Sequence, residues 1–151
     1  MVSYSINFLG TGTSHGIPVI GCDCETCRST NIKNKRYRSS VLFTKDNKHL
    51  LIDTTPEFRL QALRANVKNL DGVLYTHTHA DHLNGIDDLR VFTMRDQLPF
   101  YGNKSSIEEI ERRFSYVVGM RVDCVTSIPN LIPNILTPYK RVNISGFEVT
   151  P

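Results

Sequence analysis

Three of the five histidines in this 151-residue chain fall within six consecutive positions. His77, His79 and His82 occur in the segment THTHADH, together with Asp81 and directly after the apolar run DGVLYT. In an extended chain, residues two apart point to the same side, so His77 and His79 would present their imidazoles to one point. Asp81 and His82 are adjacent, and they would address a neighbouring point if the backbone turned after Ala80. The spacing therefore predicts two metal positions, each with part of its ligand shell.

The ligand types narrow the choice of metal. Imidazole together with carboxylate favours zinc, manganese or iron over calcium, which prefers shells made of oxygen atoms alone. The alternative is a polar loop that carries histidines near the start of a helix, and for a single histidine that alternative would be preferred. The pattern H-x-H-x-D-H at the end of an apolar strand favours a metal site instead.

Strands are predicted where hydrophobic residues alternate with polar ones or form short runs. The turn KDNK predicts a hairpin between two of these strands, and Ser145-Gly146 marks the turn of a final strand pair within 144–150. The proline-containing run 128–138 is expected to be an extended loop. The other strands are predicted at 4–9, 39–44, 49–53, 71–76 and 98–101.

Helices are predicted between these strands. One begins at Pro56, after Thr55 as N-cap, and runs to about Asn66. A second covers about 84–95. A third covers 105–118, where Ser105 with Glu108, or Ser106 with Glu109, would form a capping box. Because strands and helices alternate, the fold class is α/β or α+β.

The composition limits the partners and the compartment. A net charge of +3 tolerates a phosphate-bearing substrate but is too small to indicate a nucleic-acid surface. The start MVSYSINFLG lacks the features of a signal peptide, and no apolar run approaches the about 20 residues that span a bilayer. The length fits one domain. We therefore expect a soluble cytoplasmic protein with no membrane partner.

Three of the four cysteines form the pattern C-x-C-x-x-C in a loop-like stretch. Cys22, Cys24 and Cys27 are too clustered for a disulfide framework, but three thiolates on a short loop can surround a tetrahedral zinc ion. A closed site needs a fourth ligand. Cys124 is a candidate, although a buried strand cysteine is favoured for it. The alternative for the loop is three reduced thiols without metal.

The segment GTGTSHG is a second candidate for ligand binding. Its spacing is G-x-G-x-x-x-G, and a cysteine loop follows it instead of a helix, which argues against a dinucleotide-binding loop. The glycines are expected to allow tight turns near a metal cleft. His15 either lies near that cleft or is an exposed loop histidine.

Four segments carry a resemblance to a known family. THTHADH matches the HxHxDH signature of the metallo-β-lactamase superfamily. Together with FLGTGTSHGIPVIGCDCETC, LLIDTTPEFR and LPFYGN, in this order, it resembles the phosphoribosyl 1,2-cyclic phosphate phosphodiesterase branch. The resemblance runs from about Phe8 to Gly102 and more weakly to Pro151. It implies a four-layer αβ/βα sandwich with metals in a cleft along one sheet edge.

The resemblance also implies roles for individual residues. His77 and His79 would ligate the first metal, Asp81 and His82 the second, and Asp81 would also be catalytic by orienting the nucleophile. Asp53 would brace the metal loop, the alternative being an ordinary cap on the following turn.

The resemblance implies further roles for the cysteines and for two aspartates less directly. The branch carries a similar cysteine set with a downstream histidine, which implies a structural zinc. Asp87 and Asp88 either support the metal site or form the exposed start of a helix, and the second option is favoured for Asp88.

The family takes further ligands from later strands, whereas no histidine follows His82 in this sequence. Residues 1–151 are therefore expected to form mainly the N-terminal part of a single metallo-β-lactamase-fold domain. Such a chain would leave one sheet face bare and would be inactive alone. It would also self-associate or pair with the missing C-terminal part.

These observations lead to one hypothesis and two alternatives. The hypothesis is a metal-dependent hydrolase that cleaves small or cyclic phosphodiesters at a dinuclear site holding zinc or manganese. A ribonuclease resembling the tRNA 3′-end-processing endonucleases is the first alternative, but it would need an RNA-gripping extension or a strongly basic patch. A non-catalytic, zinc-stabilised fragment is the second.

Overall fold

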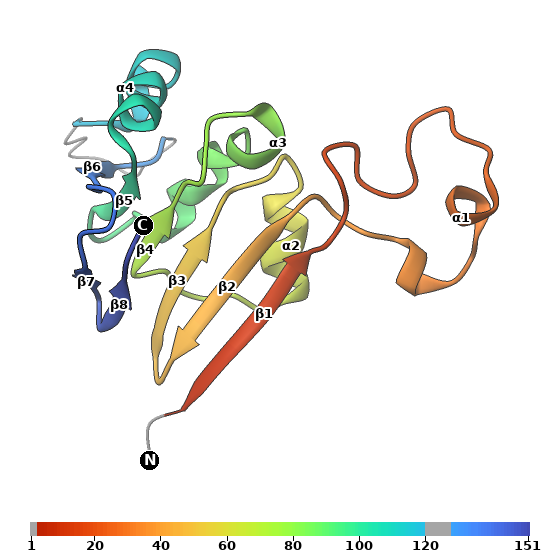
Figure 1. Cartoon of the computed structure of the whole chain (residues 1–151), viewed down its shortest axis with the longest axis horizontal. Coiled ribbons are helices and arrows are strands. Elements are labelled where there is room, and N and C mark those ends of the chain that lie inside the picture. The colour runs from red at the N-terminus through yellow and green to blue at the C-terminus, as the bar shows by residue number, and fades with distance from the viewer. Residues whose placement is uncertain (1–2, 120–127) are drawn as a thin grey trace.

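The computed structural model of the chain describes residues 3–119 and 128–151 (Figure 1). Its centre is one mixed six-stranded sheet in the order β1-β2-β3-β4-β5-β6. The first three strands pair antiparallel, and β3 to β6 pair parallel. The strands are β1 (Tyr4–Gly10), β2 (Ser40–Lys45), β3 (Lys48–Ile52), β4 (Gly72–Leu74), β5 (Leu98–Gly102) and β6 (Leu131–Ile135).

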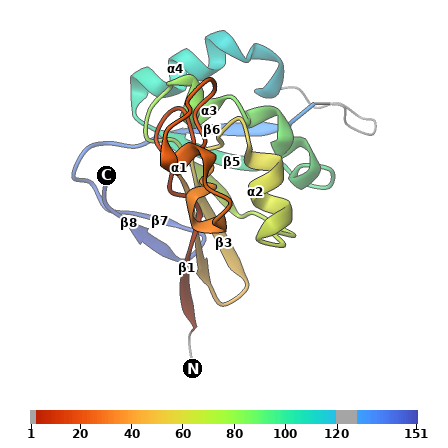
Figure 2. The same cartoon turned by 90° about the vertical axis from the view of Figure 1, so that its right-hand side faces the viewer.

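Helices connect the parallel strands, as parallel pairing requires. Between β3 and β4 lies α2 (Phe58–Arg64), and between β4 and β5 lie α3 (Ala80–Leu83) and the 3-10 helix η2 (Ile86–Phe92). The connection from β5 to β6 contains α4 (Lys104–Arg113) and η3 (Ser115–Val117). Figure 2 shows α2 on one side of the sheet and the pair β7 (Val142–Ile144) and β8 (Phe147–Val149) on the other.

The main core lies between the sheet and these helices. Leu83, Ile86 and Leu89 are fully buried, so the chain directly after the histidine segment is anchored in the core. The other large core side chains come from the strands and from α2 and α4, and they include Leu42, Leu51, Val73, Phe100, Phe58, Ile107 and Ile110.

The opposite sheet face is covered only in part. Ile144 of β7 packs over β4, where a Cβ added to Gly72 would lie 3.4 Å from its side chain. On β1, Tyr4, Ile6 and Phe8 are 69%, 57% and 63% exposed. The expected bare sheet face is therefore present over β1 in the described part of the chain.

Several predicted elements are confirmed, and others differ. The hairpin of β2 and β3 turns at 46–47, and the β7–β8 pair turns at Ser145-Gly146, both as predicted. The predicted strand 49–53 ends at Ile52, because Asp53 takes a left-handed conformation with φ 60°. The loop predicted at 128–138 contains β6, which lies at the edge of the described sheet. It tolerates Pro133 because no strand among residues 3–119 and 128–151 pairs with its outer side.

The helix predictions are wrong in their boundaries. The helix predicted from Pro56 begins at Phe58, and the region predicted as a helix at 84–95 holds the 3-10 helix η2. The third helix begins at Lys104 and ends at Arg113. Its cap is the Asn103 side chain, which accepts a 2.8 Å hydrogen bond from the Ser106 N–H, so neither predicted capping box forms the helix start.

None of the helices in the described residues is long and apolar enough to cross a membrane. Cys124 lies outside the described residues.

Candidate metal centre

The histidine segment and Asp53 meet because they follow neighbouring parallel strands. β4 ends at Leu74, and the chain then runs through the histidines into α3. Asp53 follows β3 directly, and its N–H donates a 2.9 Å hydrogen bond to the Leu74 carbonyl. The carboxyl ends of parallel strands share one edge of a sheet, which is where α/β proteins usually bind ligands.

The three imidazoles lie together at this edge. The ring centroids of His77 and His79 are 4.6 Å apart, and those of His77 and His82 are 4.2 Å apart. The backbone turns into α3 at Ala80, and the His82 ring of this helix lies beside that of His77. Asp81 Oδ2 then lies 3.3 Å from His82 Nε2.

This donor set fits divalent transition metals, which accept imidazole and carboxylate together. In the described part of the chain, no three of these four residues bring donor atoms within 4.8 Å of one another. The structure brings these side chains together in pairs: His77 lies beside both His79 and His82, and Asp81 lies beside His82.

Asp53 contacts the histidine segment with both carboxylate oxygens. Its Oδ1 accepts a 2.8 Å hydrogen bond from the Thr76 N–H. Its Oδ2 lies 2.7 Å from both the Thr76 hydroxyl and His82 Nδ1. Asp53 is only 3% exposed, so these donors satisfy a buried carboxylate and hold the segment in place.

A second set of bonds joins the same two segments. The Thr54 N–H donates to the His82 carbonyl at 2.8 Å, and the Gly85 N–H donates to the Thr54 carbonyl at 2.9 Å. The Thr54 hydroxyl lies 2.9 Å from the Tyr75 hydroxyl. Burial raises the pKa of Tyr75 well above its ordinary value, so this phenol stays neutral and can share its proton with Thr54.

Arg113 of α4 also forms hydrogen bonds to the histidine segment and the residues after it. It donates to the Thr78 carbonyl at 2.6 Å and to Asn84 Oδ1 at 3.1 Å. Sequence reasoning missed Arg113, Thr54, Tyr75 and Thr76. Of these four residues, only Thr76 could have been suspected from the sequence, because it directly precedes His77.

The remaining candidate residues lie apart from the histidines. Asp87 is engaged by Arg90 and by the Tyr116 hydroxyl. Asp88 is half-buried and lines a cavity of about 360 Å³ between α2 and η2 whose lining includes no site residue. His15 is an exposed loop histidine with Ser14 as its neighbour, which is one of the two alternatives for it.

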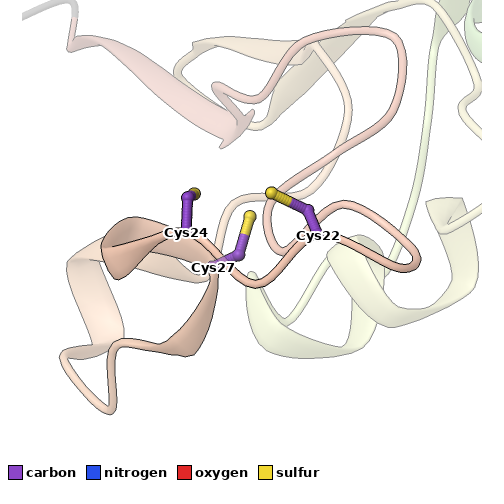
Figure 3. A group of neighbouring side chains, drawn as sticks. All are labelled: Cys22, Cys24 and Cys27. Atoms are coloured by element: carbon purple, nitrogen blue, oxygen red, sulfur yellow. The ribbon is translucent and has the colours of Figure 1, made fainter.

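The cysteines form a separate cluster in a segment that extends away from the sheet and carries α1 (Glu25–Arg28) and η1 (Ile32–Asn34) (Figure 1). The sulfur atoms of Cys22, Cys24 and Cys27 lie within 4.8 Å of one another and face a common space, as Figure 3 shows. The three thiols are free. They are placed so that they could hold a metal ion.

Hydrogen bonds shift the pKa values of two of the thiols in opposite directions. The pKa of Cys24 is lowered, mainly by the Cys27 backbone N–H and then by the side chains of Cys22 and Cys27. At Cys27 the Val19 N–H acts to lower the pKa, but the Cys22 side chain and burial outweigh it and the pKa is raised. Cys24 is therefore the first of this pair to become a thiolate, the form that binds metal.

Comparison with known protein families shows to which superfamily the chain belongs. Residues 48–151 match the model of the beta-lactamase superfamily domain. The chain belongs to this superfamily. An octanoyltransferase from Porphyromonas gingivalis (strain ATCC BAA-308 / W83) is 46% identical over 110 residues, which are 72% of this chain and 22% of that protein. The anti-Pycsar protein Apyc1 of Bacillus phage vB_BsuM-Goe3 is 40% identical over 62 residues, 38% of this chain and 24% of that protein.

Solved structures agree with this assignment. A diphosphatase from the PhnP family has a TM-score of 0.84 and 34% identity, and the match covers 98% of this chain and 56% of that one. Zn²⁺-bound PqqB from Methylobacterium extorquens shares the fold, with a TM-score of 0.73, 19% identity, and coverage of 95% and 48%. The expected metallo-β-lactamase fold is confirmed. The chain spans about half of these two solved chains, and less than a quarter of the two curated relatives.

Proposed function

We propose that this chain is part of a metal-dependent hydrolase that cleaves small or cyclic phosphodiesters. The observation that carries the proposal is the cluster of His77, His79 and His82 with Asp81 at the carboxyl end of β4. The similarity to a PhnP-family diphosphatase, at 34% identity over 98% of the chain, favours a phosphorus ester as the substrate class.

In this proposal the residues divide between two metal positions. His77 and His79 hold one divalent ion, and Asp81 and His82 hold the other, with zinc and manganese as the ions that suit these donors. When bound, such ions act as Lewis acids toward phosphoryl oxygens and make water a better nucleophile. Asp81 is half-buried beside His82, a position from which its free carboxylate oxygen orients the attacking water. Asp53 and Arg113 keep the segment in one conformation.

The cysteine loop has a different task in the proposal. Cys22, Cys24 and Cys27 hold a structural zinc ion, which fixes a segment that otherwise contributes only Cys27 to the buried hydrophobic residues. Free thiols of this kind are typical of a reducing compartment, which supports a cytoplasmic location.

The partners follow from the same surfaces. The exposed stripe of Tyr4, Ile6 and Phe8 supports coverage by further polypeptide, either a second copy of the chain or another segment of the same protein. A small phosphodiester needs no extended basic surface, and a net charge of +3 agrees with that. The chain is accordingly proposed to act without a nucleic-acid or membrane partner.

The test compares variants of the full-length natural protein. His79→Ala and Asp81→Ala are each expected to reduce hydrolysis of bis(p-nitrophenyl) phosphate and of a small cyclic phosphodiester at least about 100-fold, because misplaced reacting groups are costly. Circular dichroism should show that both variants fold. His15→Ala removes an exposed histidine and is the matched control.

Two results would count against the proposal. Normal turnover in either variant, at unchanged metal content, would remove this mechanism. Efficient cleavage of precursor transfer RNA with little turnover of small diesters would favour the ribonuclease. A human tRNase Z, short form, has a TM-score of 0.52 at 20% identity, which shows a common fold alone.

A further inference from the structure

One hydroxyl group links the two halves of the histidine cluster. Thr76 Oγ1 lies 2.7 Å from Asp53 Oδ2 and 3.0 Å from His77 Nδ1. The Thr76 backbone is held as well, because its N–H donates to Asp53 Oδ1 at 2.8 Å. Thr76 therefore sits between a buried carboxylate and a candidate metal ligand.

Counting protons decides the direction of these two hydrogen bonds. The Thr76 hydroxyl has a single proton, and it donates that proton to Asp53 Oδ2. The Thr76 oxygen then offers only lone pairs to His77. The proton of the second hydrogen bond must come from His77, which carries it on Nδ1. A neutral imidazole with a proton on Nδ1 keeps the lone pair of Nε2 free.

The same carboxylate oxygen determines the state of a second histidine. His82 Nδ1 lies 2.7 Å from Asp53 Oδ2, so it is also the protonated nitrogen of its ring. The Nε2 atom of His82 then carries the lone pair of the ring, and it lies 3.3 Å from Asp81 Oδ2. Asp53 thus determines the tautomer of His82 directly and that of His77 through the Thr76 hydroxyl.

We infer that Thr76 is a positioning residue that holds His77 in the Nδ1–H tautomer and leaves Nε2 as its metal-binding atom. Its effect on metal affinity rests on the proposed function, in which His77 and His82 serve different metal positions. Through Asp53, Thr76 couples the ring state of a ligand in the first position to that of a ligand in the second. A carboxylate-histidine-metal arrangement is common in proteins, and here a hydroxyl extends it to a second ring.

Two substitutions separate the hydroxyl from the shape of the side chain. Thr76→Val has nearly the same shape but no hydroxyl, and Thr76→Ser keeps the hydroxyl without the methyl group. Both retain the backbone N–H that bonds to Asp53, so both are expected to fold. The measurement is ¹⁵N nuclear magnetic resonance of the histidine rings in the metal-free full-length protein at about pH 8, above the ordinary histidine pKa of about 6.5. His77→Gln identifies the His77 signals.

The expected pattern is specific. Wild-type protein and Thr76→Ser should show the Nδ1–H tautomer at His77, and Thr76→Val should lose it. His82 should keep its Nδ1–H tautomer in all three proteins, because its bond to Asp53 is direct. In a zinc titration, Thr76→Val should bind about 10- to 100-fold more weakly, and Thr76→Ser should stay within about threefold of wild type.

Two results would overturn the inference. One is an Nε2–H tautomer at His77 in the wild-type protein. The other is a Thr76→Val variant that keeps both the Nδ1–H tautomer and the zinc affinity. The proposed function fails separately: a protein with the expected tautomers and zinc affinities, but no phosphodiester hydrolysis, would reject the substrate class and still support the role of Thr76.

Discussion

Asp53 Oδ2 and His82 Nδ1 are 2.7 Å apart, although 29 positions separate the two residues in the sequence. The contact follows from the topology. Asp53 leaves β3, His82 lies in α3 just beyond β4, and the two strands are parallel neighbours. Asp53 has a φ of 60°, a region that aspartate and asparagine adopt more readily than most residues.

The first prediction tests this contact with Asp53→Asn. Asparagine tolerates the left-handed backbone, so the fold should survive with a small change in Tm. The amide has one acceptor oxygen where the carboxylate has two, so His82 or Thr76 loses its partner. Zinc affinity in the full-length protein is expected to fall about 10- to 100-fold, as measured by competition with a chelator. Wild-type affinity in this variant would refute a supporting role for Asp53.

A second prediction concerns Arg113, which donates to the Thr78 carbonyl and to Asn84. Arg113→Met should destabilise the protein by about 1–3 kcal/mol, because it removes hydrogen bonds from a charged donor. Hydrogen exchange should become faster in the segment 77–84. Arg112→Met is the matched control, since the Arg112 side chain is exposed and bonds to Glu109 of its own helix. Equal effects of the two substitutions would contradict the prediction.

Gly85 provides a test of packing against the Asp53 segment. A Cβ at this position would lie 2.1 Å from the Thr55 carbonyl oxygen and 2.8 Å from Phe58 Cβ. Gly85→Ala should therefore destabilise by about 1–3 kcal/mol or more in chemical denaturation. Gly102→Ala is the control, because an added Cβ there would lie 3.5 Å from Ser106 Cβ, an ordinary contact distance. The prediction is wrong if the two variants have the same free energy of unfolding.

The cysteine loop should respond to Cys24→Ser by losing about one zinc ion per chain, since three thiolates are the proposed ligands. Elemental analysis and thermal unfolding are the measurements, and the loss of Tm should exceed the loss of hydrolytic rate. Thr26→Ser is the control, because it changes an exposed residue of the same loop that is not a proposed ligand. Unchanged zinc content in Cys24→Ser would mean that the three thiols are only neighbours.

Because Tyr75 is buried, we expect the folded protein to lose stability at alkaline pH. Burial raises the pKa of Tyr75 above its ordinary value of 10.0, so the unfolded chain releases this proton at a lower pH than the folded one. The contribution of Tyr75 is therefore complete below about pH 10 and declines above it, by up to about 1.36 kcal/mol per pH unit. Tyr75→Phe should show a shallower decline between pH 9 and 11. Tyr139→Phe, at a residue 91% exposed, should match the wild-type slope.

Local patterns in the sequence predicted much of this fold. The hairpin of β2 and β3 depends on alternation and a polar turn, which lie within a few residues of one another. The histidine cluster was predictable for the same reason, because its donors are close in sequence and the strand before it is apolar.

Features that depend on tertiary context were not predictable in this way. Strand β6 has Pro133 in its middle, and only its place at the sheet edge makes that proline acceptable. The helix α4 begins at Lys104 because the Asn103 side chain caps it by accepting from the Ser106 N–H, although two capping boxes fit the sequence equally well. Arg113 is 35 positions from the Thr78 carbonyl that it binds, and no local pattern records such a contact.

The stripe of Tyr4, Ile6 and Phe8 has a consequence for how the protein is made. β1 is an edge strand of the described sheet, and it is synthesised before the rest of that sheet. An uncovered edge strand with aromatic and branched residues on one face tends to aggregate with other incompletely folded chains. We expect the nascent chain to need a holding chaperone at this strand until another segment or a second copy covers it.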